Sequence, residues 1–236
     1  MRILSVLPVL LFCLAGCGED EFGPYTHGTF TDSRDQNEYN WIRIGEQIWM
    51  AGNLAWLPAV SNPSKGSDTE TYYYVTGYQG DDADEARDHA HYATYGVLYN
   101  WQASRKACPE GWRLPTDSDW TELTDWLAQN GYGHGGSGND IGKSIASTTG
   151  WQVSAASGTL GNNPATNNKT GFNAPPGGYR RGSGGFYGRG VQAAFWMSST
   201  DSTSHARALF LSYDDPGVVH NSFYRRDGFS VRCVKK

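Results

Sequence analysis

ACPEGWRLPT, residues 107–116, joins a short strand or turn to the clearest helix of the chain. Pro115 fixes the backbone direction at the entry to that helix, and Thr116 is placed to cap its first turn. Asp119, three residues after Thr116, completes the pattern of a capping box. The Asn-Gly pair at 130–131 predicts the end of the helix. One face of the helix is apolar and carries Trp120, Leu123 and Leu127 at spacings i, i+3 and i+7.

Strand patterns lie on both sides of this helix. Residues 39–44 alternate between apolar and polar side chains, and a turn at 45–47 leads into the apolar residues 48–50, so the segment predicts a β-hairpin. A second, short helix is expected at 102–107, where Pro109 ends it. Two helices among short antiparallel strands and long loops make the predicted fold class α+β. The other strand candidates are residues 71–78, 194–199, 206–211 and 229–234, with polar turns between the last three.

Composition supports one globular domain with long, tightly turned loops. Of the 236 residues, 30 are Gly and 32 are aromatic, while only 18% are charged, against about 25% charged in an average protein. Residues 131–190 hold 17 of the glycines, so the long loops are expected there, with Trp151 and Phe172 as apolar anchors. The net charge of −5 supplies no surface for phosphates, and no nucleic-acid partner is expected. The aromatic core is predicted to contain Trp49, Trp101, Trp112, Trp120 and Trp196.

The N-terminal segment predicts export and lipidation. The apolar run from Ile3 to Gly16 is shorter than the about 20 residues that a membrane-spanning helix needs, so residues 1–16 are expected to be a signal peptide. Residues 14–17, Leu-Ala-Gly-Cys, resemble a bacterial lipobox, which makes Cys17 the predicted lipidation site and gives the protein a membrane anchor. The alternative is an ordinary secretory signal. An acidic, flexible tether is expected over residues 17–28.

The acidic residues that follow Cys17 indicate where in the cell envelope the protein is located. Residues 18–21, Gly-Glu-Asp-Glu, resemble the signal that sends Bacteroidetes lipoproteins to the outer face of the outer membrane. On that resemblance, we expect an outer-membrane lipoprotein that faces the cell exterior. The alternative is that these residues are only a solvated tether.

Four cysteines are present, and the N-terminal segment accounts for two of them, Cys13 and Cys17. The remaining pair, Cys108 and Cys233, predicts one disulfide in an exported chain. That bond would join the middle of the chain to its last strand. A metal site or a redox pair is the alternative, although no CxxC or Cys/His spacing supports either of them.

Six blocks of sequence stand out, in this order: residues 44–54, 95–101, 107–116, 177–180, 195–200 and 228–234. Together they are similar to the Fibrobacter succinogenes major paralogous domain, and the similarity covers residues 29–236. That family resembles the C-type-lectin-like fold, in the branch shared with the formylglycine-generating enzymes and with variable receptors. The resemblance implies a lectin-like domain over residues 29–236, with Cys108 and Cys233 in a structural bridge. Those enzymes use a metal-bound cysteine pair, which this chain then lacks.

Patterns of catalysis and of cofactor binding are weak in this chain, and we expect neither an enzyme nor a cofactor. The six histidines form no HExxH motif, and Ser183 lies in no nucleophile elbow. His89 and His91 are the closest approach to a metal pair, but exposed loop histidines explain them more simply. The acidic residues 81–88 suit Ca²⁺ less well than a solvated surface, because their spacing is not that of an EF-hand. Paired carboxylates of a glycoside hydrolase remain an alternative, since they need not be close in sequence.

The C-terminal third carries polar side chains that suit ligand binding. In the variable receptors that the family resembles, this part of the chain forms the binding face. We therefore expect a non-catalytic surface binding module, an adhesin or receptor for a glycan or protein. A structural or pilus-associated surface subunit is the alternative function, and ordinary exposed strand and turn residues are the alternative for these side chains. The candidate ligand-binding residues are Ser202, His205, Arg207, Tyr213, Asp214, His220, Asn221, Tyr224 and Arg225.

Overall fold

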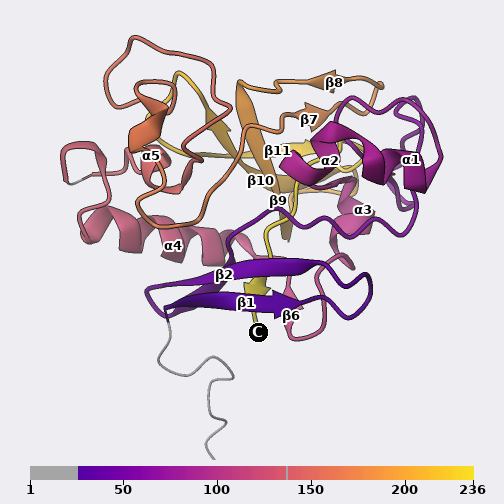
Figure 1. Cartoon of the computed structure of the whole chain (residues 1–236), viewed down its shortest axis with the longest axis horizontal. Helices are drawn as coiled ribbons and strands as arrows, with labels where there is room; N and C mark the ends of the chain where they lie inside the picture. The colour runs from indigo at the N-terminus through magenta and orange to yellow at the C-terminus, as the bar shows by residue number, and fades with distance from the viewer. Residues whose placement is uncertain (1–25, 137) are drawn as a thin grey trace, which may run out of the picture.

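The computed structural model describes residues 26–136 and 138–236, and within them the predicted α+β class is confirmed (Figure 1). The predicted signal peptide, the lipidation site Cys17 and nearly all of the tether lie outside the described residues. Strand β1 begins at His27, two residues before the expected start of the domain. The strands are β1 (His27–Thr31), β2 (Glu38–Ile44), β3 (Gln47–Met50), β4 (Tyr73–Tyr74), β5 (Leu98–Tyr99), β6 (Trp112–Arg113), β7 (Tyr179–Arg180), β8 (Phe186–Tyr187), β9 (Gln192–Thr200), β10 (His205–Ser212), β11 (Val219–Tyr224) and β12 (Val234–Lys235). The α-helices are α1 (Ala83–Asp88), α2 (Ala90–Tyr95), α3 (Trp101–Ser104), α4 (Asp117–Gln129) and α5 (Gly142–Ile145).

A five-stranded antiparallel sheet ties the two ends of the domain together, in the order β1-β2-β3-β12-β6. The predicted hairpin is its centre, with Ile44 paired to Gln47 across a turn in which Gly45 takes a positive φ of 59°. The last strand, β12, pairs with β3 and β6. The predicted disulfide between Cys108 and Cys233 is confirmed beside β12, with a Cα–Cα distance of 5.8 Å.

The second sheet is antiparallel in the order β11-β10-β9, and two of its strands separate two hydrophobic cores. Because successive side chains of a strand point to opposite faces, Trp196 of β9 packs in one core and Phe195 in the other. In the same way, Ala208 of β10 faces the first core and Leu209 the second. All five tryptophans predicted for the core are at most 4% exposed, so that prediction is confirmed.

Helix α4 forms as the sequence predicts. The Asp119 carboxylate accepts the Thr116 amide at 2.6 Å, and the Thr116 hydroxyl oxygen accepts the Asp119 amide at 3.1 Å, which completes the capping box. Arg113 adds two bonds to the same carboxylate, at 2.5 and 2.7 Å. Burial alone would raise the pKa of Asp119, but the hydrogen bonds from Arg113 and Thr116 outweigh it and lower that pKa. Trp120, Leu123 and Leu127, which form the predicted apolar face, are fully buried.

The expectation of two helices is wrong, since the described residues contain five α-helices. The three helices that were not predicted, α1, α2 and α5, are only four to six residues long. A helix of one or two turns repeats no apolar face for a periodicity argument to find. Two of them have a side-chain cap: the Asp82 carboxylate accepts the Asp84 and Glu85 amides of α1, and the His89 side chain accepts the His91 amide of α2. None of the described helices is long and apolar enough to cross a membrane.

Two predictions for the C-terminal strands also need correction. The polar turn expected before residue 229 contains a strand, β11, which was missed because it lies at a sheet edge and exposes side chains on both faces. Residues 229–234 form no continuous strand. Phe229 makes a single bridge to Tyr99 of β5, and Ser230 makes one to Phe195 of β9. Arg232, two residues later, donates to backbone carbonyls instead of continuing a strand.

The Gly-rich region 131–190 is dominated by loops, as predicted, and buried side chains hold it in place. Trp151 is 6% exposed and Phe172 is fully buried, so both predicted anchors are confirmed. The fully buried Arg232 donates to the carbonyl oxygens of Phe172 and, at 2.8 Å, of Asn173. Buried Arg180 likewise donates to the carbonyl of Pro63 at 2.6 Å. Two arginine side chains therefore hold loop backbone that no sheet pairs.

Candidate functional site

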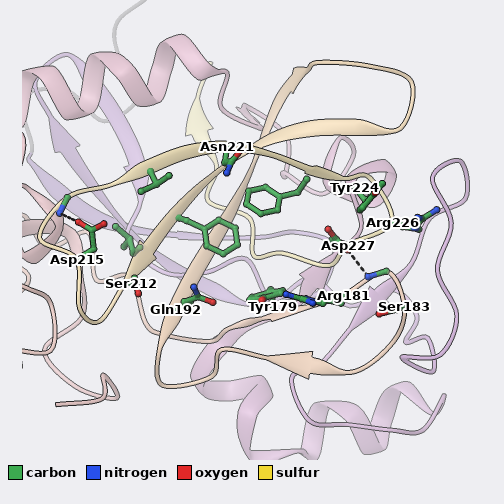
Figure 2. Close-up of a pocket in the computed structure, with 16 residues that line it drawn as sticks. Tyr179, Arg181, Ser183, Gln192, Ser212, Asp215, Asn221, Tyr224, Arg226 and Asp227 are labelled. Carbon is green, nitrogen blue, oxygen red and sulfur yellow. Dashed lines mark hydrogen bonds between the residues drawn. The ribbon is translucent and has the colours of Figure 1, made fainter. Parts of the chain in front are cut away.

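A cleft of about 610 Å³ opens between one face of the β9–β10–β11 sheet and the β7–β8 hairpin (Figure 2). It is apolar at its centre and polar at its two ends. Such a combination, a mainly apolar hollow with a few directed polar groups, is typical of small-ligand sites. We therefore take this cleft as the candidate functional site.

Aromatic rings form the floor of the cleft. Phe210 of β10 and Phe223 of β11 stack with their ring centroids 4.6 Å apart and an interplanar angle of 20°. Strand register makes the pair possible, because the small Ala206 stands opposite Phe223 and leaves room for the ring. Tyr179 of β7 closes the floor edge-on to Phe210 at 5.7 Å. The buried ring of Phe229 supports both phenylalanines from beneath, at 5.3 and 5.1 Å.

One end of the cleft carries amide, hydroxyl and carboxylate groups. Gln192 of β9 and Ser212 of β10 are register partners, and both side chains lie at this end, as does Asp215. The Asp215 carboxylate accepts the Gly217 amide at 2.8 Å, which fixes the turn before β11. The exposed side chain of Asn221 projects over the cleft from β11. This end therefore offers hydrogen-bond donors and acceptors together.

The opposite end is richer in positive charge and is built on the turn after β7. The amide of Gly182 donates to the Asp227 carboxylate at 2.6 Å, drawn as the dashed line in Figure 2. Burial raises the pKa of Asp227, although that hydrogen bond and nearby arginines oppose the shift. Arg226 lies over the ring of Tyr224 at 4.6 Å and pairs with Asp68 at 3.4 Å. Arg181 and Ser183 complete this end (Figure 2).

The nine predicted ligand-binding residues are not gathered in one place. Asn221 and Tyr224 line the cleft. Arg207 and His220 both contact Asp117 at the start of α4, at 3.2 and 3.1 Å. Strand alternation explains the separation, because the side chains of both residues point to the opposite face of the sheet from that of Asn221.

The other predicted residues lie at the ends of β10 and after the end of β11. Arg225 donates to the carbonyl of Ser202 at 2.5 Å and covers the ring of Trp101 at 4.3 Å. The ring of His205 packs at a tilt against that of Tyr224, with ring centroids 4.3 Å apart. Tyr213 and Asp214 follow the last residue of β10 and lie outside the cleft.

Sequence reasoning missed most of the residues that line the cleft. Phe210 lies inside a predicted strand, but its partner Phe223 lies in the strand that was expected to be a turn. The apolar residues at both ends of β11 are a sequence signal from which this strand could have been predicted. The β7–β8 side of the cleft comes from a region expected to be loop. The missed lining residues include Tyr179, Arg181, Gln192, Phe210, Phe223, Arg226 and Asp227.

Other groups that the sequence singled out are engaged locally. Asp82 accepts two amides at the start of α1, and Asp84 pairs with Arg87 at 2.6 Å. His89 caps α2, while the Nδ1 atom of His91 is 2.8 Å from the carbonyl oxygen of Thr76. No group of three or more His, Cys, Asp or Glu is arranged for a metal ion in residues 26–136 and 138–236.

A second cavity, of about 660 Å³, lies beside helix α2. Two of its three tyrosines are hydrogen-bonded to the backbone through their hydroxyl groups. The Tyr39 hydroxyl oxygen accepts the Ala55 amide at 3.0 Å, and the Tyr92 hydroxyl donates to the Ala55 carbonyl at 2.8 Å. Burial raises the pKa of Tyr39. This cavity therefore presents no stacked aromatic floor comparable to that of the cleft.

Comparison with known proteins gives one match. The family model described as the Fibrobacter succinogenes major domain matches residues 42–235. This range contains both disulfide cysteines and every residue that lines the cleft. No curated protein and no solved structure matches the chain.

Proposed function

Because the chain belongs to the Fibrobacter succinogenes major domain family, whose name assigns no activity, we propose a function from the cleft itself. The protein is a non-catalytic binding module of the cell envelope, and its ligand is a glycan held on the aromatic floor. The observation that carries the proposal is the stacked pair Phe210 and Phe223 between two polar ends.

A sugar ring matches this arrangement in its chemistry. It has an apolar face of C–H groups, which packs on an aromatic ring, and a rim of hydroxyl groups, which need directional hydrogen bonds. Phe210 and Phe223 supply the ring surface. The Gln192 amide group both donates and accepts hydrogen bonds, and the Asn221 amide offers its N–H donors while its oxygen accepts the Ser222 amide at 2.7 Å.

The carboxylates of the cleft support binding in preference to hydrolysis. Asp215 accepts the amide of Gly217, and Asp227 accepts the amide of Gly182. Both groups therefore fix the backbone of turns that shape the cleft. A glycoside hydrolase would need two carboxyl groups that face one bond of the substrate. The hydrogen bonds to Gly217 and Gly182 instead orient both carboxylates toward the protein backbone.

The cellular setting is proposed from the sequence. Residues 14–17 resemble a lipobox, so Cys17 would carry the lipid anchor, and the acidic residues 18–21 favour the outer face of the outer membrane. A C-type-lectin-like fold is part of the proposal, supported by long loops held on a frame that the Cys108–Cys233 bond ties together. Protease treatment of intact cells tests the location. Digestion is expected before lysis, and protection until lysis would contradict it.

A glycan array tests the function. Wild-type protein should bind a subset of glycans, and Phe223→Leu should bind them about 2- to 13-fold more weakly, because it keeps volume but loses the aromatic face. The matched control is Tyr132→Leu, which removes a ring that packs on Trp126 outside the cleft. If no glycan binds, or if both variants behave alike, the proposed function is wrong.

One observation favours the alternative of a structural surface subunit. Strand β11 ends its sheet, with Val219 and Tyr224 about half exposed. An edge of this kind pairs with strands of other chains. Light scattering of the purified protein over a range of concentrations measures this directly. Assemblies that Val219→Lys disrupts would support the structural role, and a monomer at all concentrations would oppose it.

A further inference from the structure

Arg181 stands at the basic end of the cleft and has no carboxylate partner within ion-pair distance among the described residues. We propose that the ligand of the cleft is an acidic glycan, whose carboxylate binds the guanidinium of Arg181 while its sugar ring packs on Phe210 and Phe223. The inference rests on the proposed function, since it names the class of glycan.

The backbone of Arg181 is held in place before any ligand arrives. Its amide donates to the carbonyl of Gly185 at 3.1 Å, and its carbonyl accepts the amide of Gly184 at 2.8 Å. The neighbouring amide of Gly182 is bonded to Asp227. The turn is thus closed by three hydrogen bonds, so little conformational entropy remains to be lost when a ligand binds.

The Arg181 side chain is oriented as well. Its guanidinium lies above the ring of Tyr187, 5.2 Å from the ring centroid. The face of an aromatic ring attracts a cation, and this attraction stabilises the position of the guanidinium. A planar guanidinium presents parallel N–H groups that match the two oxygens of a carboxylate. Ser183, in the same turn, adds a hydroxyl donor at this end of the cleft.

The other charges of the cleft set the direction in which the ligand lies. Arg226 is already paired with Asp68, so it is a weaker candidate for the anion. Asp227 lines the same end, but it is 8% exposed and its carboxylate accepts the amide of Gly182, which offsets part of its charge. Asp215 lies at the far end, where it would repel a second anion. The acidic sugar therefore belongs at the Arg181 end.

A comparison of acidic glycans with their carboxyl-reduced forms tests this inference. Full-length protein in detergent is titrated calorimetrically with uronate oligosaccharides of several linkages and with the same compounds after reduction of the carboxyl groups to alcohols. The best ligand should be acidic, and its reduced form should bind about 10- to 100-fold more weakly, as expected for loss of a charge-assisted hydrogen bond. Arg181→Gln should lower the affinity for the acidic form to that of the reduced form, and Arg181→Lys should be intermediate.

The matched control is Arg105→Gln, which removes the same charge from an exposed arginine outside the cleft and should leave affinity unchanged. Thermal unfolding of each variant checks that it is folded. Affinity that is indifferent to carboxyl reduction, or to Arg181→Gln, would overturn the acidic ligand and leave the glycan module standing. Binding of hexaglutamate with no binding of any glycan would overturn both proposals.

Discussion

Trp120 and Trp196 are both fully buried, but only one of them has a hydrogen-bond partner for its indole N–H. The Nε1 atom of Trp196 donates to the Tyr99 carbonyl at 2.7 Å, whereas that of Trp120 has no acceptor among the described residues. Replacement by Phe removes the same atoms from each. The two variants should therefore differ in stability chiefly by the state of the N–H group.

The magnitude follows from the two hydrogen-bond terms. Trp120→Phe removes a buried, unpaired donor, which relieves a penalty of about 1–3 kcal/mol. Trp196→Phe loses a hydrogen bond worth about 1 kcal/mol. The Tyr99 carbonyl keeps a second bond, from the Phe229 amide at 3.0 Å, so it is not left unpaired. We expect Trp120→Phe to be less destabilising than Trp196→Phe by about 2–4 kcal/mol.

Equilibrium unfolding in urea, with the disulfide intact, measures the difference. The m-value should be the same for both variants if only the folded state changes. Trp120→Ala serves as a reference and should cost about 3–5 kcal/mol, because it opens a cavity beside Trp49 and Phe172. The reasoning fails if Trp120→Phe is as destabilising as Trp196→Phe, or more so.

Three further predictions concern the disulfide and two carboxylates of opposite behaviour. Replacing Cys108 and Cys233 together by Ser should cost about 5 kcal/mol in urea unfolding, because the bond spans 125 residues and its loss frees the unfolded chain; a cost under 1 kcal/mol would contradict this. Asp119 has a lowered pKa, so its contribution to stability is present above about pH 4 and is lost as pH falls through the folded-state pKa. Asp119→Asn should therefore flatten the dependence of the unfolding free energy on pH in this range. An unchanged pH dependence would contradict the lowered pKa. Asp227 has a raised pKa, so protonation of its carboxyl group stabilises the fold at low pH, and this stabilisation is lost as pH rises through the folded-state pKa. Asp227→Asn should therefore become more stable relative to wild type as pH rises. A relative loss of stability over the same pH range would contradict the raised pKa.

The parts of the fold that could be predicted carry their signals within a few residues. Thr116, Asp119 and the apolar face that follows define α4 without any tertiary contact. The hairpin over 38–50 needs only alternation and a turn. The Cys108–Cys233 bond was the pairing left once the N-terminal segment had accounted for the other cysteines.

The cleft could not be predicted, because its residues meet only through long-range pairing. Phe210 and Phe223 stack because β10 and β11 pair in one register, and a shift of one residue would turn Phe223 to the other face. Tyr179 reaches the floor from a hairpin in the Gly-rich region. The same alternation separates Arg207 and His220 from the cleft, although His220 precedes Asn221 and Arg207 precedes Ala208, the register partner of Asn221.

The central claim, that a glycan lies on the floor formed by Phe210 and Phe223, is tested most directly by NMR. Backbone and side-chain resonances of labelled protein are followed while the best glycan of the array is added. The account predicts that the largest shifts fall on Tyr179, Phe210, Asn221 and Phe223. Shifts confined to the second cavity, around Tyr92 and the rest of α2, would contradict it.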